Sequence, residues 1–207
     1  MYMVVIGVDS STRNLNLGIY SEKVSIGRKF DTFRAHVEKI DYYLEELLKD
    51  AGMEITDIDA FCVTNGPGSY SGLRVGSAFV KGMMFERELD FISISTVYVM
   101  AFHYRESNEK IGVVYDIKHD RLVFADNREF KEIIIDEDNV GEISWDSYKL
   151  IGNGIKLLEE NFGIEGLNIL RDGILEPGGE DVAYAGYLAI KSGQKEDIVH
   201  FEPRYFK

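Results

Sequence analysis

Cysteine is almost absent from this sequence: Cys62, in the stretch DAFCVTN, is the single one among 207 residues. A lone thiol cannot form an intrachain disulfide, which excludes a disulfide-stapled fold and fits a reducing compartment. Apolar runs are short, and none is long enough to cross a membrane. The opening segment, MYMVVIGVDSS, lacks the basic region of a signal peptide. These absences predict a cytoplasmic protein without membrane contact.

Basic residues are in the minority, with 23 Lys and Arg against 36 Asp and Glu, for a net charge of −13. Residues 1–106 carry 11 basic and 15 acidic residues, and residues 107–207 carry 12 and 21. Proteins that bind nucleic acid neutralise its phosphates with a basic surface. The chain is therefore a poor candidate to bind nucleic acid by itself, and it suits a basic partner protein better.

One order of elements occurs twice along the chain. Hydrophobic periodicity and turn residues predict three strands, then helix, strand, helix, strand and helix, followed by a similar second series. MVVIGVD (residues 3–9) opens the first series and KIGVVYD (residues 110–116) opens the second. This pattern indicates an α/β fold in which one unit is duplicated. We expect an N-terminal lobe over residues 1–107 and a C-terminal lobe over residues 108–207, with a strand over 167–173 in the second.

The stretch TNGPGSYSGLR, from Thr64 to Arg74, joins a predicted strand to a predicted helix. Glycines permit backbone conformations with positive φ, and a helix N-terminus presents free N–H groups that suit an anion. The stretch is neither GxxxxGK[ST] nor GxGxxG, so it matches no standard phosphate loop. Two interpretations remain open at this point: a cradle for phosphate, or a rigid connection that lets the helix pack closely.

The helix predicted after this turn is apolar around most of its circumference, which favours burial. Gly72 and Gly76 lie four residues apart on it, a spacing that allows another helix to approach closely. That second helix could come from another subunit or from the same chain, and periodicity does not decide between them.

Several motifs together resemble the TsaB (YeaZ) family. They are VIGVDSST, HVEKIDYYLEELL, GPGSYSGLRVGSAFVKGM, VVYDIKHDRLVFA and EPRYFK, which follow one another along the whole chain. The GPGS(F/Y)(T/S)GLR stretch is the most specific of them. The resemblance implies the actin/Hsp70/sugar-kinase-like (ASKHA) fold, an α/β fold with two lobes each built on a βββαβαβα unit, in agreement with the duplication described above. The ending Pro203–Lys207 departs from the P-x-Y-L-R pattern of the family, since Phe206 replaces leucine and Lys207 replaces arginine.

The same resemblance implies a function within a complex. TsaB proteins are non-catalytic partners of TsaD, which transfers threonylcarbamoyl to the adenosine beside the anticodon of tRNAs that read ANN codons. The expected partners are a TsaD-like catalytic subunit and a TsaE-like ATPase, with a homodimer when the chain is alone and tRNA reached only through the complex. No intrinsic cofactor is expected, and ATP or ADP would bind at a partner interface.

We expect the interface on two helices, because an apolar helix pair is a natural docking surface. The predicted interface residues are His36, Ile40, Tyr43, Leu44, Leu47, Gly72, Leu73, Gly76, Phe79, Val80 and Met83.

Independent catalysis finds little support in the sequence. The catalytic relatives hold a metal with HxxxH, whereas His36, His103, His119 and His200 are far apart, so no local metal site is predicted. A peptidase would need a nucleophile paired with a base. Cys62 lies in mid-strand, and neither Ser69 nor Ser71 stands in a GxSxG motif.

A small-molecule kinase or ATPase on the same fold is the stronger alternative. It would bind nucleotide at the first hairpin and at a glycine turn in the second lobe, a site that we expect to be vestigial here. These residues are Asp9, Ser10, Ser11, Thr12, Gly152 and Gly154.

Overall fold

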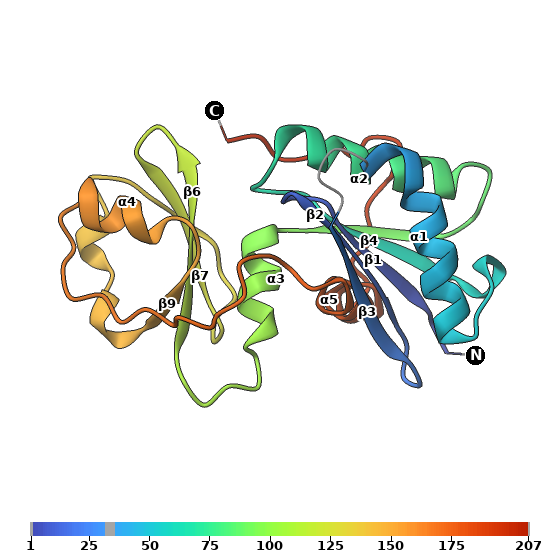
Figure 1. Ribbon diagram of the computed structural model, residues 1–207, viewed down its shortest axis with the longest axis horizontal. Coiled ribbons are helices and arrows are strands. Elements are labelled where there is room, and N and C mark those ends of the chain that lie inside the picture. The colour runs from blue at the N-terminus through green and yellow to red at the C-terminus, as the bar shows by residue number, and fades with distance from the viewer. Residues whose placement is uncertain (1, 32–35, 207) are drawn as a thin grey trace. The chain divides into compact units, whose positions relative to one another are not determined.

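The structure is a computed structural model that describes residues 2–31 and 36–206 (Figure 1). Contacts divide the chain into two compact units. The first contains the residues up to Thr96 together with Pro177–Tyr205, and the second contains Val97–Glu176 together with Phe206. The last helix therefore packs with the first part of the chain. The lobe boundary between residues 107 and 108 stays a prediction.

A five-stranded sheet forms the centre of the first unit. Its strands are β1 (Val5–Asp9), β2 (Asn14–Tyr20), β3 (Ser25–Asp31), β4 (Ala60–Thr64) and β5 (Asp90–Ile94), in the spatial order β3-β2-β1-β4-β5. The first three form the expected antiparallel meander, and β4 and β5 add in parallel. Every residue of β1 and β4 is buried, as expected for central strands with both faces covered.

Helices cover both faces of this sheet. Figure 1 shows α1 (His36–Ala51) and α2 (Tyr70–Met84) on one face and α5 (Gly179–Lys191) on the other. Apolar residues of α1 and α2 pack with Ile6 and Val8 of β1 in one hydrophobic core. A short 3-10 helix, Ile55–Asp57, lies between α1 and β4.

The last helix, α5, packs against the strands backbone to backbone. A Cβ atom on Gly18 of β2 would lie 2.1 Å from the carbonyl carbon of Gly179, and one on Gly7 of β1 would lie 2.3 Å from the amide nitrogen of Ala183. Side chains larger than hydrogen would push the helix off the sheet. The glycines of two segments that are far apart in sequence therefore create this contact.

The second unit contains a smaller mixed sheet. Its strands are β6 (Ile111–Lys118), β7 (Arg121–Asp126), β8 (Ile133–Ile135) and β9 (Lys149–Ile151), in the order β8-β7-β6-β9. It also contains α3 (Thr96–His103), α4 (Ile155–Glu160) and the 3-10 helices Val140–Glu142 and Trp145–Ser147. Buried residues of β6 and β7 form its cores.

The prediction of a strand over residues 167–173 is wrong. The segment makes only an isolated parallel bridge, in which Ile169 pairs with Leu150 of β9. The Leu150 amide donates to the Asn168 carbonyl at 2.8 Å, and the Leu170 amide donates to the Leu150 carbonyl at 3.0 Å. Because β9 is only three residues long, it offers no backbone for a longer ladder.

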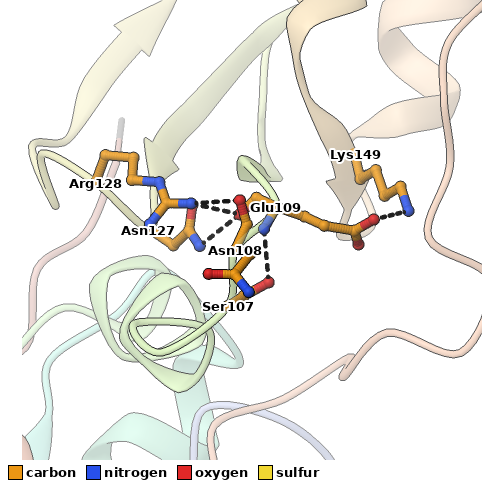
Figure 2. A network of polar contacts seen from close by, with 6 residues as sticks. All are labelled: Ser107, Asn108, Glu109, Asn127, Arg128 and Lys149. Atoms are coloured by element: carbon orange, nitrogen blue, oxygen red, sulfur yellow. Dashed lines mark hydrogen bonds and ion pairs between the residues drawn. The ribbon is translucent and has the colours of Figure 1, made fainter.

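The chain between α3 and β6 is tied down by side chains from the end of β7 (Figure 2). The amide nitrogen of the Asn127 side chain donates to the carbonyls of Tyr104 and Glu109, at 2.8 and 3.0 Å. Arg128 donates to the Asn108 carbonyl at 2.9 Å, and Lys149 pairs with the Glu109 carboxylate. The segment where a break between lobes is predicted is thus an ordered part of the second unit. In the described part of the chain, residues 2–31 and 36–206, no helix is long and apolar enough to cross a membrane.

Candidate functional site

Asp9, which ends β1, is the central polar residue of the first hairpin. Its side chain is fully buried. The Thr64 hydroxyl donates to Oδ1 at 2.6 Å, the Ser11 amide donates to the same atom at 3.2 Å, and the Asn16 side chain donates to Oδ2 at 3.3 Å.

Burial raises the pKa of Asp9, and the hydrogen bonds from Thr64 and Ser11 offset part of this effect. The groups that satisfy the carboxylate come from the chain itself. Asp9 therefore joins the ends of β1, β2 and β4, and its oxygens are occupied by the chain's own donors.

The glycine turn closes over this hairpin. The amide of Ser69 donates to the Ser11 carbonyl at 2.6 Å, and a Cβ atom on Gly68 would lie 2.5 Å from the same oxygen. The Gly66–Pro67 peptide bond is cis, and Gly66 has φ of 106°. Of the two interpretations of this turn, the geometry supports the rigid connection: the turn binds the hairpin of its own chain.

The beginning of α2 makes the second contact with the hairpin. Ser69 is the N-cap, and its hydroxyl accepts a hydrogen bond from the Gly72 amide at 3.2 Å. The Ser10 hydroxyl donates to the Gly72 carbonyl at 2.9 Å. Cβ atoms on Gly72 and Gly76 would lie 2.1 and 2.3 Å from the Ser10 carbonyl and hydroxyl oxygens. The close approach that these two glycines allow is thus made by Ser10.

Within residues 2–31 and 36–206, the hydroxyl of Ser11 meets no hydrogen-bond partner although the residue is 1% exposed. Thr12, the last residue of the predicted group, is half-buried, and its hydroxyl accepts from the Asn14 amide at 3.3 Å. The hairpin residues expected to contact nucleotide are therefore mostly packed inside the first unit.

Gly152 and Gly154, the other predicted nucleotide residues, belong to the second unit. Gly152 has φ of 112°, and a Cβ atom there would lie 2.1 Å from the Val114 carbonyl oxygen. The Gly154 amide donates to that same oxygen at 3.0 Å, and Asn153 between them accepts from the Asp116 amide at 2.9 Å. The two predicted groups lie in different units, and each is built as a tight turn.

Apart from Gly72 and Gly76, whose contacts with Ser10 are described above, the predicted interface residues differ in burial. Five are core residues of the first unit, buried among their own chain: Ile40, Leu44, Leu47, Leu73 and Val80. Three are half-buried: Tyr43, Phe79 and Met83. His36 is the first residue of α1, and its side chain lies outside the described residues.

The exposed surface of this helix pair consists of other residues. Tyr42 on α1 is 53% exposed, and Phe85, the C-cap of α2, is 74% exposed. Both residues lie within the predicted helix pair, residues 36–48 and 72–85. They are missing from the predicted interface residues because periodicity finds the buried stripe of a helix. The available signal was the presence of a large apolar residue outside that stripe.

Sequence reasoning also missed the partners of the glycine turn. Thr64 could have been found from strand order, since β1 and β4 pair in parallel and carry Asp9 and Thr64 at their carboxyl ends. The C-terminal tail could not have been found in this way. Its Arg204 amide donates to the Asn65 carbonyl at 2.8 Å, and the Tyr205 hydroxyl accepts from Arg74 Nε at 3.2 Å.

The remaining candidates for chemistry are isolated. In the described residues, no group of three or more His, Cys, Asp or Glu side chains could hold a metal ion. Cys62 is buried, and burial raises the pKa of its thiol, which keeps it protonated. Two depressions in the second unit, of about 250 and 480 Å³, are lined by residues other than Gly152 and Gly154.

Comparison with known proteins identifies relatives in one modification system. A family model described as TsaD: tRNA N6-adenosine threonylcarbamoyltransferase matches residues 31–162. The tRNA threonylcarbamoyladenosine biosynthesis protein TsaB of Escherichia coli K12 is 24% identical, over 99% of this chain and 95% of that protein. A tRNA N6-adenosine threonylcarbamoyltransferase of Kosmotoga olearia is 29% identical, over 65% of this chain but only 39% of its own length.

Solved structures confirm the fold. YeaZ from Pseudomonas aeruginosa superposes with a TM-score of 0.78 at 19% identity, covering 99% of this chain and 100% of the other. An uncharacterized protein with similarity to the peptidase YeaZ, from the same organism, gives 0.82 at the same identity and the same two coverages. The α/β fold of the actin/Hsp70/sugar-kinase type, which the motifs implied, is thus confirmed.

Proposed function

Since the chain belongs to the TsaD family of tRNA N6-adenosine threonylcarbamoyltransferases, we propose that it acts in tRNA threonylcarbamoyladenosine biosynthesis as the non-catalytic partner of a TsaD-like subunit. The TsaB relative matches this chain nearly end to end, whereas the matched transferase is much longer. The substrate would be the adenosine beside the anticodon of tRNAs that read ANN codons.

The enclosed Asp9 hairpin is the observation that carries the non-catalytic role. A phosphate or metal site needs a carboxylate and backbone N–H groups that face a ligand. Here the Asp9 oxygens accept from Thr64, Ser11 and Asn16, and the Ser69 amide is used by the Ser11 carbonyl. Opening this joint to a nucleotide would require breaking several buried hydrogen bonds. ATP or ADP would therefore bind at a partner interface.

The outer surface of α1 and α2 is the surface we assign to the TsaD-like subunit. Tyr42 is exposed on α1 and Phe85 at the end of α2, and Tyr43, Phe79 and Met83 on the same two helices are half-buried. Aromatic and methionine side chains are enriched at protein interfaces. In the absence of the partner the same surface would pair two copies of this chain, and a TsaE-like ATPase would join the assembled complex.

Coexpression with the TsaD-like protein of the same genome tests the proposal. The two proteins should co-purify, and the pair, supplied together with a TsaE-like ATPase, should restore threonylcarbamoyladenosine in tRNA, measured by nucleoside mass spectrometry. Phe85→Ser should weaken the affinity of the complex at least tenfold, because truncation of an interface hot spot costs roughly 2 kcal/mol or more of binding free energy. Leu175→Ser is the matched control, since Leu175 is 75% exposed in the second unit.

The result that would contradict the proposal is equally specific. ATP turnover by the purified chain alone, abolished in Asp9→Asn while the variant stays folded, would assign the chain to the kinase or ATPase class. Failure to co-purify with any TsaD-like protein, together with unaltered tRNA modification in a strain lacking the chain, would also overturn it.

A further inference from the structure

Three side chains of the first unit form an exposed aromatic and cationic cluster where α2 begins. The Arg74 guanidinium carbon lies 4.0 Å from the centre of the Tyr70 ring and 5.8 Å from that of Tyr205. The two ring centres are 4.8 Å apart, and Arg74 Nε donates to the Tyr205 hydroxyl at 3.2 Å. Tyr70 and Arg74 stand four residues apart on one helix face, so the helix itself aligns them.

This cluster is exposed and yet fixed in place. Tyr70 is 56% exposed and Tyr205 is 37% exposed. The tail that carries Tyr205 is held by the hydrogen bond from the Arg204 amide to the Asn65 carbonyl, and the Arg204 carbonyl oxygen would lie 3.0 Å from a Cβ atom on Gly66. Rigid, exposed rings pay little entropy when they bind a flat partner, so the arrangement is pre-organised for stacking.

The charge around the cluster is opposite to that of the whole chain. Residues 60–85, which form β4, the glycine turn and α2, contain Arg74 and Lys81 but no Asp or Glu, in a chain of net charge −13. The neighbouring tail adds Arg204 and also Glu202, whose carboxylate interacts electrostatically with Arg74. By contrast, α1 carries five acidic residues: Glu38, Asp41, Glu45, Glu46 and Asp50. With Glu202 counted, residues 60–85 and 201–206 together carry three basic residues against one carboxylate, and this excess favours a partner that is itself negatively charged.

We propose that the cluster of Tyr70, Arg74 and Tyr205 contacts a single-stranded segment of nucleic acid. A base would stack on the exposed tyrosine rings, and Arg74 would face the adjoining phosphate. The exposed hydroxyls of Ser69 and Ser71 lie beside it at the positive end of α2, where an anion is favoured. Stacking on aromatic side chains combined with a nearby cation is the usual means of binding unpaired bases.

This contact goes beyond the proposed function, in which tRNA is reached only through the complex. Its strength is limited by the charge of the rest of the chain. At physiological ionic strength the Debye length is about 8 Å, so the local charge at the cluster outweighs the distant carboxylates. The isolated chain should therefore bind single-stranded RNA with a dissociation constant on the order of 10⁻⁴ M, the weak end of non-specific binding.

Amide chemical-shift mapping of the full chain tests the contact directly. The probe is a mixed-sequence, single-stranded RNA of about eight nucleotides, within the usual site size of such proteins, at an ionic strength of about 0.15 M. We expect the shifted amides to lie in residues 68–74 and 203–206. Because the isolated chain is titrated, failure here would leave the partner role untouched.

Substitutions separate stacking from charge. Tyr70→Ala should weaken RNA binding by about fivefold or more, since stacking contributes roughly 1–3 kcal/mol per base, and Tyr70→Phe should retain it. Arg74→Gln should lower the slope of log K against log salt by about 0.7, the value for one phosphate of a single strand. Tyr42→Ala is the matched control, because Tyr42 is a similarly exposed tyrosine on the acidic helix.

Three results would overturn the inference. One is the absence of shifts at residues 68–74 in the wild-type chain at saturating RNA. Another is equal RNA affinity of the Tyr70→Ala and Tyr42→Ala variants. The third is loss of binding to the TsaD-like protein in Tyr70→Ala while RNA binding is unchanged, which would make the cluster a protein-docking surface. Tyr70 and Tyr42 are exposed, so we expect their substitutions to leave the fold intact. Amide shifts that are unchanged away from the substituted residue will show that each variant is folded.

Discussion

Asp9 and Asp116 occupy the same place in the two repeated series of strands, yet their surroundings differ completely. Each follows a buried run of its strand, β1 or β6. Asp9 is fully buried and accepts from Thr64, Ser11 and Asn16. The Asp116 side chain is 24% exposed and accepts from the amide and the ammonium group of Lys118, at 2.7 and 3.0 Å.

The difference shows how duplication allows one copy to change its use of a residue. In the first unit the carboxylate joins three strands beneath a glycine turn. In the second it closes a local turn on its own strand, followed by His119 and Asp120 with positive φ. Asp9 ends β1, whereas Asp116 lies two residues before the end of β6. The side chains around each aspartate decide whether it binds a ligand, supports the core or faces water.

The largest expected effect is at the contact between α2 and the first hairpin. Gly72→Ala should destabilise the protein by about 3 kcal/mol, because its Cβ would meet the Ser10 carbonyl oxygen at 2.1 Å and backbone must move. Gly154→Ala in the second unit should cost less, since its nearest contact is a flexible Leu122 methyl group at 2.7 Å. Urea unfolding measures both.

Gly82→Ala is the control for helix propensity, because nothing lies within 4 Å of that position. It should stabilise α2 by up to about 1 kcal/mol. Equal destabilisation by Gly72→Ala and Gly82→Ala would contradict the close contact with Ser10.

The next effect tests Asp9 as a joint. Asp9→Asn replaces one acceptor oxygen with a donor amide, which faces either the Asn16 donor or the donors of Thr64 and Ser11. Leaving such groups unsatisfied in a buried site should cost about 2 kcal/mol. Chemical denaturation of the variant measures this cost. An unchanged free energy of unfolding in Asp9→Asn would mean that the carboxylate is not needed to hold the strands together.

The difference in stability between the wild type and Asp9→Asn should depend on pH, and its direction follows from the pKa shift of Asp9. Burial raises the pKa of Asp9 in the folded protein above the unfolded value of about 3.9. The folded state then binds the proton more tightly than the unfolded state does, and this proton binding stabilises the fold. The stabilisation is fully present below about pH 4 and is lost as the pH rises through the folded pKa.

The stability advantage of the wild type over Asp9→Asn should therefore shrink above about pH 4. Paired denaturation curves at several pH values measure this. An advantage that grows with pH would show that hydrogen bonding to the carboxylate outweighs its burial.

Much of this arrangement could be predicted from the sequence, and particular residues show where prediction ended. Alternation and helical periodicity located β1, α1 and α2, because burial of apolar groups follows from local pattern. The same periodicity placed Leu44 and Leu47 on an apolar stripe without showing what covers it, and that stripe is covered by the chain's own core.

Contacts between distant segments were the other limit. The hydrogen bond from Arg204 to Asn65 and the packing of α5 on β1 and β2 join residues more than a hundred positions apart. No local propensity encodes such pairs. Gly7, Gly18 and Gly179 could be read from the sequence. That they lie against one another in the contact between α5 and the sheet is shown only by the structure.

A smaller effect is expected at Ser10. Ser10→Ala removes the hydrogen bond to the Gly72 carbonyl and should cost about 1 kcal/mol, the usual contribution of a buried neutral pair. Thermal unfolding of this variant beside Gly72→Ala separates the hydrogen bond from the steric contact. A cost as large as that of Gly72→Ala would mean that the hydroxyl, and not the closeness of the backbones, holds α2 on the hairpin.

The smallest effect is expected at the second aspartate. Asp116→Asn should change the free energy of unfolding by less than about 0.5 kcal/mol, as for most surface substitutions. Its turn is solvent-exposed, and water can replace the contact with Lys118. A loss comparable to that of Asp9→Asn would remove the contrast between the two units.

The backbone contact of α5 with β1 and β2 has a consequence for biosynthesis. The ribosome releases the first sheet long before it makes Gly179–Lys191, so one face of that sheet emerges without its cover. Until α5 arrives, the buried strands present an apolar surface to other nascent chains and to chaperones. Completion of the first unit thus waits until translation has passed Lys191, and any stall inside the second unit prolongs the exposure.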